Sequence, residues 1–147
     1  MPPDDTIIAD EIQLVVVGAH MSGMPLNHQL TTLGARLVRR TATAASYNLF
    51  ALADTDPAKP GLLRVGRDCG GKIEVEVWAL APGPFAAFVS AIPSPLGIGT
   101  IMLSDGTFAQ GFLVESIAIE AAENITRFGG WRQFIAHRSA GVQASTG

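Results

Sequence analysis

Apolar and polar residues alternate in several short stretches of this chain, and their spacing predicts more strands than helices. The clearest strand is expected at Lys72–Leu80. One face of this strand carries Ile73, Val75, Val77 and Ala79. The other face carries Glu74, Glu76 and Trp78, and we expect a solvated outer face for the two carboxylates, with a place in the mouth of the sheet as the alternative.

Six further stretches are expected to form strands. They are Gln13–Val17, Arg36–Thr43, Ser46–Leu52, Leu62–Val65, Thr100–Leu103 and Phe108–Val114. The last two flank Asp105-Gly106, which is a strong signal for a hairpin turn. Residues 115–126 fit a helix and a strand equally well.

Helical spacing is limited to short segments. Asn27–Leu33 predicts a short helix that Gly34 ends, and the Asn27 side chain is expected to cap it, with contact to a ligand as the alternative. A second helix is expected to begin near Pro84, because the apolar residues that follow it recur at helical spacing, namely Phe85, Phe88, Val89 and Ile92. A final helical turn or two is predicted by Trp131, Phe134 and Ile135.

The order of these elements mixes hairpins with one or two strand–helix crossovers. This order predicts an α+β fold with a mixed sheet that could close into a barrel. The 147 residues fit a single domain, 1–147, that buries roughly 70% of its unfolded surface. We expect an ordered core at about residues 12–138 and frayed ends at 1–11 and 139–147, where residues are small, polar or bear Pro and Gly.

Composition narrows the function classes. A net charge of −3 with scattered arginines argues against a nucleic-acid surface, which needs clustered Lys and Arg. Cys69 is the single cysteine, so no internal disulfide can form and a reducing compartment is expected. The first residues lack a signal-peptide pattern, and every apolar run is far shorter than the ~20 residues of a membrane span. We therefore expect a cytoplasmic protein without nucleic-acid or membrane partners.

The segment Val15–His28 carries the most chemistry. An apolar run leads into a turn with Gly18, His20 and Gly23, and an amphipathic run follows. A buried strand that ends in such a turn, with a helix just beyond, leaves backbone N–H groups directed at one place. This arrangement favours the binding of an anion such as a carboxylate.

Four motifs in the same order make the chain similar to one known family. They are Val17–Asn27 (VGAHMSGMPLN), Glu74–Leu80 (EVEVWAL), Ile92–Thr100 (IPSPLGIGT) and Asn124–Thr126 with Gly129–Arg132. On these motifs the chain resembles the allophanate hydrolase C-terminal domain from about Val15 to Ala136. The resemblance implies a γ-glutamylcyclotransferase-like fold, which is a small mixed β-barrel with flanking helices.

In the family an amidase domain precedes this one, and the C-terminal domain is understood to decarboxylate the N-carboxycarbamate that the amidase releases. The chain carries no amidase signature, so it is not expected to be a complete allophanate hydrolase, and its own Met1 favours a stand-alone relative over an excised domain. Decarboxylation of N-carboxycarbamate, or of a related small acid, is therefore one expectation. The alternatives are non-catalytic binding of a small carboxylate or dicarboxylate, and assembly as a homodimer or with a separate amidase.

Cyclotransferases of this fold rely on a glutamate as acid and base, just after the strand that corresponds to Lys72–Leu80 and its following helix. In this chain Phe88–Pro95 occupies that region and contains no carboxylate. We therefore do not expect γ-glutamylcyclotransferase activity.

His20 is the candidate catalytic acid, because an ordinary histidine pKa of ~6.5 allows proton transfer near neutral pH; the alternative is a histidine that shapes its own loop. Tyr47, the only tyrosine, is the second catalytic candidate, unless its ring only packs. The candidate substrate-binding residues are Gly18, Ala19, His20, Met21, Asn27 and Arg64. The Arg64 guanidinium can pair with a carboxylate, although arginine side chains more often lie on a solvated face. Met21 can contact a ligand, although methionine more often fills a core. No cofactor and no metal are expected, because Cys and His do not cluster.

Overall fold

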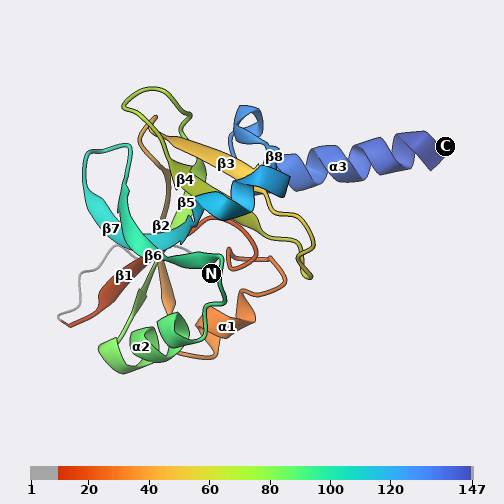
Figure 1. Cartoon of the computed structure of the whole chain (residues 1–147). Coiled ribbons are helices and arrows are strands. Elements are labelled where there is room, and N and C mark those ends of the chain that lie inside the picture. The colour runs from red at the N-terminus through yellow and green to blue at the C-terminus, as the bar shows by residue number, and fades with distance from the viewer. Residues whose placement is uncertain (1–9, 147) are drawn as a thin grey trace.

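The computed structural model describes residues 10–146, and the side chains of residues 10–140. Figure 1 shows the elements in chain order. The strands are β1 (Ile12–Val16), β2 (Arg36–Ala42), β3 (Tyr47–Ala51), β4 (Pro60–Arg64), β5 (Glu74–Leu80), β6 (Leu96–Met102), β7 (Phe108–Val114) and β8 (Glu123–Asn124). The helices are α1 (His28–Thr31), α2 (Pro82–Ser90) and α3 (Trp131–Thr146), with 3-10 turns η1 (Ser116–Ala121) and η2 (Thr126–Phe128).

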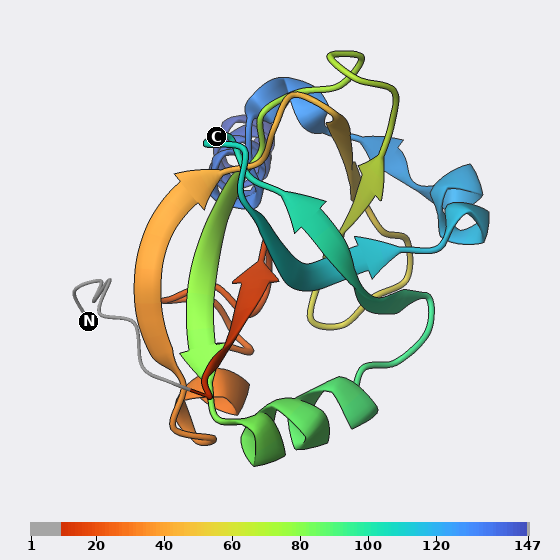
Figure 2. The ribbon, with the colours of Figure 1, turned by 90° about the vertical axis from the view of Figure 1, so that its left-hand side faces the viewer.

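The strands form two sheets, which confirms the expected α+β class with mixed pairing. A five-stranded sheet has the order β2-β5-β1-β7-β6, and a three-stranded sheet has the order β4-β3-β8. β1 pairs antiparallel with β5 and parallel with β7, while the other neighbours are antiparallel. The strands of the described residues therefore curve around a common core (Figure 2) as two sheets and not as one closed barrel.

The two sheets approach each other where β4 passes β7. A Cβ atom built on Gly61 of β4 would lie 2.8 Å from Cβ of Val114 in β7. Real Cβ atoms do not approach this closely, so the absence of a side chain at Gly61 permits the contact. This contact brings the start of β4, and the loop before it, next to the turn that follows β1.

The core corrects one prediction about β5. Glu76 is 1% exposed and Trp78 is 1% exposed, so the face expected to be solvated is buried. The alternation along β5 could not reveal this, because β5 is an interior strand and chain from two distant segments covers that face. Ser22 comes from the turn after β1, and Arg132 comes from α3. Glu74, at the end of the strand, is only partly buried.

Several element boundaries also differ from the predictions. α1 has only four residues, and α2 begins at Pro82, two residues earlier than expected. β6 begins at Leu96 instead of Thr100, directly after the turn at Pro95. The ambiguous segment 115–126 contains both a 3-10 turn and the two-residue strand β8.

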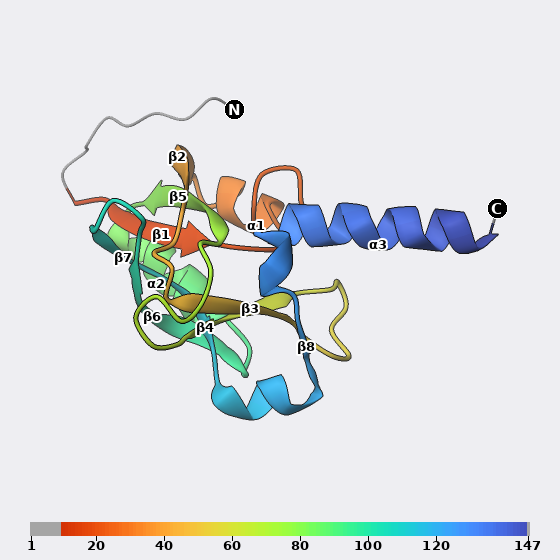
Figure 3. The same ribbon diagram turned by 90° about the horizontal axis from the view of Figure 1, so that it is seen from above.

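α3 is longer than the one or two turns that its apolar residues predict. It has 16 residues, and its first turns pack Trp131 and Phe134 into the core while the remainder extends away from the body (Figures 1 and 3). Of the frayed ends expected at residues 1–11 and 139–147, residues 1–9 and 147 lie outside the described residues, while α3 continues to Thr146. No helix in the described part of the chain is long and apolar enough to cross a membrane.

Candidate functional site

The turn after β1 is held by its own backbone. The N–H of Met21 donates to the carbonyl oxygen of Gly18 at 3.0 Å, and the N–H of Leu26 donates to that of Ala19 at 2.8 Å. A Cβ atom on Gly18 would overlap the ring of Pro60, so glycine is required where the turn packs against the start of β4. The strand end and the turn therefore place His20 at a fixed position beside β4.

Asn27 supports this turn in a way that the sequence did not reveal. It occupies the N-cap position of α1 but makes no side-chain capping hydrogen bond, so the predicted cap is wrong. Its Nδ2 instead donates to the carbonyl oxygen of His20 at 2.8 Å. The backbone of Asn27 is already helical, and the amide side chain therefore satisfies a turn carbonyl instead of the first helical N–H groups.

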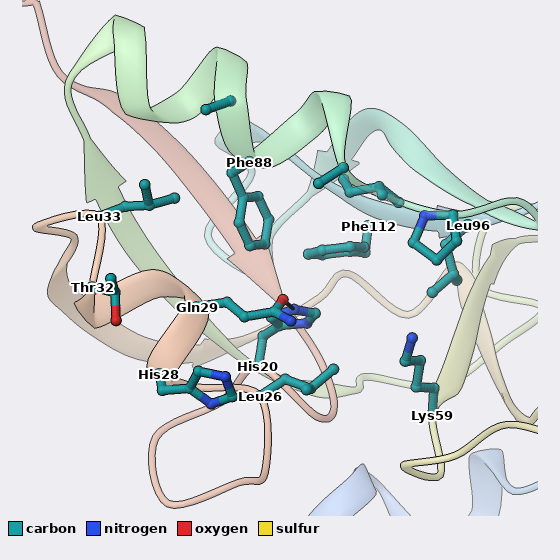
Figure 4. Close-up of a pocket in the computed structure, with 14 residues that line it drawn as sticks. His20, Leu26, His28, Gln29, Thr32, Leu33, Lys59, Phe88, Leu96 and Phe112 are labelled. Carbon is teal, nitrogen blue, oxygen red and sulfur yellow. Dashed lines mark hydrogen bonds between the residues drawn. The ribbon is translucent and has the colours of Figure 1, made fainter.

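The imidazole of His20 lies between two phenylalanine rings. It stacks on Phe112 with ring centroids 5.1 Å apart, and it meets the Phe88 ring edge-on at 5.2 Å. Its Nε2 donates to Oε1 of Gln29 at 2.7 Å, since an amide oxygen can only accept (Figure 4). The neutral ring then has a bare Nδ1, which has no hydrogen-bond partner among the described residues.

Burial lowers the pKa of His20 below its ordinary value. The hydrogen bond that His20 donates to Gln29 opposes this effect, while the positive charges of Lys59 and His28 add to it. His20 is therefore neutral at neutral pH. An anion beside the ring would reverse the balance and raise the pKa.

His20 lines a pocket of about 530 Å³ between α1, α2 and the start of β6. Lys59 reaches the same pocket from the loop before β4 (Figure 4). The other polar side chains in its wall are His28, Gln29 and Thr32. The remaining wall is apolar and includes Leu26, Leu33, Phe88, Leu96 and Phe112. A niche of about 20 Å³ adjoins it between Gly18, Ala19 and Lys59.

The structure brings together three of the predicted site residues, Gly18, Ala19 and His20. It places the others away from the pocket wall. Met21 is fully buried in the core, and Arg64 is exposed on β4. Tyr47 is also fully buried, and its hydroxyl accepts a hydrogen bond from the N–H of Met102 at 2.9 Å.

Sequence reasoning also missed Lys59 and Gln29, which line the pocket with His20. Lys59 belongs to a Lys-Pro-Gly group that predicts only a turn, and no local pattern relates it to His20. The link is the packing of Pro60 on Gly18, which exists only in three dimensions. Gln29 is nine residues after His20, and the short helix α1 turns it back toward the imidazole ring.

The buried carboxylate of Glu76 holds the turn after β1 in place by hydrogen bonds to Ser22. Oε1 of Glu76 accepts from the backbone N–H of Ser22 at 2.7 Å and from Nε1 of Trp78 at 3.0 Å. Oε2 accepts from Oγ of Ser22 at 2.6 Å and from Nη2 of Arg132 at 2.9 Å. The Arg132 guanidinium also donates to the carbonyl oxygen of Ser22 at 2.7 Å. These bonds join the turn to β5 and α3.

Burial alone would raise the pKa of Glu76, but the Ser22 hydrogen bonds, the Trp78 hydrogen bond and the Arg132 charge together lower it. The carboxylate is therefore charged at neutral pH and fully engaged, and it does not line the pocket. Among the described residues, no three His, Cys, Asp or Glu side chains are grouped so that they could hold a metal ion.

Known proteins share this arrangement of sequence and fold. Residues 12–136 match the family model of the allophanate hydrolase C-terminal domain. The urea amidolyase of Saccharomyces cerevisiae is 38% identical over 142 residues, which cover 90% of this chain and 8% of that protein. The structure of the K. lactis urea amidolyase is 36% identical with a TM-score of 0.84, over 92% of this chain and 8% of that one. The chain thus spans less than a tenth of the length of these relatives.

A short chain is also similar. The structure of c4763, a uropathogenic E. coli-specific protein, is 35% identical with a TM-score of 0.79, over 86% of this chain and 97% of that one. A mouse aig2-like protein shares the fold at 16% identity with a TM-score of 0.55, over 74% of this chain and 78% of that one. The fold is thus γ-glutamylcyclotransferase-like, and the match over residues 12–136 shows that the chain belongs to the allophanate hydrolase C-terminal domain family.

Proposed function

We propose that the pocket beside His20 binds a small carboxylate or dicarboxylate in urea or allophanate metabolism and assists the decarboxylation of an N-carboxycarbamate-like substrate. The observation that carries the proposal is the meeting of His20 and Lys59 in an otherwise mostly apolar pocket. A positive side chain in such surroundings favours an anionic ligand, because burial of unpaired charge is costly. Membership of the family supports urea or allophanate metabolism as the setting.

The chemistry follows from the charges. One carboxylate of the substrate pairs with the Lys59 ammonium, and binding of the dianion raises the pKa of His20 so that Nδ1 takes up a proton. Loss of CO2 breaks a C–N bond and leaves its electron pair on the carbamate nitrogen. His20 then delivers its proton to that nitrogen and returns to its neutral form. Lys59 assists in this step in place of Tyr47, whose hydroxyl is already engaged in the core.

The test has two readouts. Malonate serves as a stable dianion, and thermal unfolding should move to higher temperature as malonate is added, because it binds only the folded chain. In a coupled assay, a separate amidase converts allophanate and CO2 release is followed. The protein should accelerate this release, and His20→Asn should lower the added rate by about 10²- to 10⁴-fold.

Lys59→Met tests the anion site directly and should weaken malonate binding about tenfold, as expected for a loss of about 1.4 kcal/mol. Lys72 offers a matched control, because it is exposed and does not line the pocket. Lys72→Met should leave both readouts unchanged. Equal CO2 release with and without the protein would contradict decarboxylation, and malonate binding with no gain in rate would favour a binding role. If malonate does not raise the unfolding temperature at all, the proposal of a carboxylate site is contradicted.

A further inference from the structure

The pocket is larger and more apolar than a small dicarboxylate requires. Its volume of about 530 Å³ falls in the range of about 300–1,000 Å³ found for sites that enclose drug-sized ligands. Most of its wall is apolar, and the charged end occupies only the region around His20 and Lys59. A dianion at that end would leave the rest of the wall in contact with water, which is unfavourable.

The apolar part lies along α2. Phe88 is the buried residue of this helix, and its ring is directed at His20 (Figure 4). Ala87 and Ala91, one turn apart, also line the pocket and remain exposed. Methyl groups at these two positions leave the space open that longer side chains would fill. Leu33, on the opposite side in Figure 4, completes an apolar cleft.

We infer that the preferred ligand is a carboxylate or dicarboxylate that carries an apolar substituent, such as an aryl or branched alkyl group. Its acidic end pairs with Lys59 and His20, and its substituent packs on Phe88 and between α2 and Leu33. The charged and apolar regions adjoin within one cavity, so a single molecule can satisfy both. This inference rests on the proposed carboxylate site and names the class of acid that it takes.

The test compares malonate with benzylmalonate by calorimetric titration of the full chain. Burial of a phenyl ring is expected to make benzylmalonate bind about 10- to 100-fold more tightly than malonate. Toluene, which has the ring without the acid, should bind far more weakly than benzylmalonate. Lys59→Met should weaken the binding of both acids.

Two variants, one at the C-cap of α2 and one within the helix, locate the substituent. Ala91→Phe fills the apolar part and should remove the advantage of benzylmalonate while malonate binds as before. Ala86→Phe is the matched control, because Ala86 is exposed on the same helix and does not line the pocket. It should leave both affinities unchanged.

The outcomes separate the two proposals. If malonate binds and benzylmalonate binds no better, the inference is overturned and the proposed carboxylate site stands. If neither acid binds, the proposed carboxylate site fails as well. An advantage for benzylmalonate that survives Ala91→Phe, or that Ala86→Phe removes equally, would also overturn the inference, because the substituent would then lie outside this pocket.

Discussion

Glu76 should be the carboxylate whose loss costs this fold most, and the structure allows the cost to be worked out. Its two oxygens accept four hydrogen bonds from Ser22, Trp78 and Arg132. Glu76→Gln keeps one oxygen but turns an NH2 group toward the Arg132 guanidinium, which can only donate. A hydrogen bond to a charged group contributes about 1.5–3 kcal/mol, so we expect Glu76→Gln to lower the free energy of unfolding by about 2–3 kcal/mol.

Glu76→Ala removes all four acceptor contacts and leaves Arg132 only the Ser22 carbonyl oxygen and the partly exposed Glu74, so we expect a loss of about 3–4 kcal/mol. Such a loss is large beside the ~5–15 kcal/mol that stabilises a typical domain. Glu74→Gln is the matched control on the same strand. The side chain of Glu74 is 37% exposed and lies 3.5 Å from Nε of Arg132, so this change should cost at most about 1 kcal/mol.

Urea unfolding followed by tryptophan fluorescence measures these differences at several pH values. The pKa of Glu76 is lowered in the folded chain, so its stabilising effect is complete above its ordinary value of 4.5. The effect is lost as the pH falls through the lowered folded value. The stability gap between the natural chain and Glu76→Gln should therefore be constant between about pH 6 and 8 and shrink below the ordinary carboxyl pKa. A Glu76→Gln cost no larger than that of Glu74→Gln, or a gap that does not shrink in acid, would refute this reasoning.

Three further predictions concern the pocket and its supports. Gly18→Ala places a methyl group against the ring of Pro60 and should lower the free energy of unfolding in urea by about 1–3 kcal/mol. Gly83→Ala is the control on α2, where an added Cβ has nothing within 4 Å, and it should raise the free energy of unfolding by about 0.5–1 kcal/mol. Equal effects of the two changes would contradict the close approach. Tyr47→Phe removes the acceptor of a backbone N–H and should lower the free energy of unfolding by about 1–3 kcal/mol. Malonate affinity should not change, since Tyr47 does not line the pocket. A loss of malonate affinity in a titration would contradict this placement of Tyr47 outside the site. Malonate should bind more tightly as the pH falls from about 8 to 6, because the lowered pKa of His20 rises when the anion binds. A malonate affinity that does not change over this pH range would contradict a role of His20 in anion binding.

Local pattern was sufficient for much of the fold. The alternation at Lys72–Leu80 marks β5, and Asp105-Gly106 marks the hairpin between β6 and β7, because both signals are carried by neighbouring residues. The local sequence pattern gave a wrong prediction where a side chain is buried by segments that are distant in the sequence. Glu76 alternates like a surface residue and is buried because α3 and the turn after β1 cover it. The length of α3 was missed because few apolar residues follow Phe134.

The same distinction between local and distant signals applies to the candidate site. His20 could be predicted because a glycine-containing turn after an apolar strand has a recognisable local form. Lys59 could not be predicted, because its position depends on the contact between Gly18 and Pro60, some forty residues apart in sequence. The single tyrosine, Tyr47, is a candidate from the sequence, but its hydroxyl accepts a hydrogen bond from the N–H of Met102 in β6, and no local pattern predicts that contact.

The pairing of β1 has a consequence for synthesis of the chain. β1 leaves the ribosome before both of its partner strands, β5, which ends at Leu80, and β7, which ends at Val114. At an elongation rate of ~5–20 residues per second, β1 remains without β7 for roughly 5–20 s. Pairing between segments so distant in sequence also slows the folding step itself. The newborn chain therefore presents an apolar, unpaired strand to chaperones for seconds, and a chain released before Phe108 would keep one edge of β1 open to aggregation.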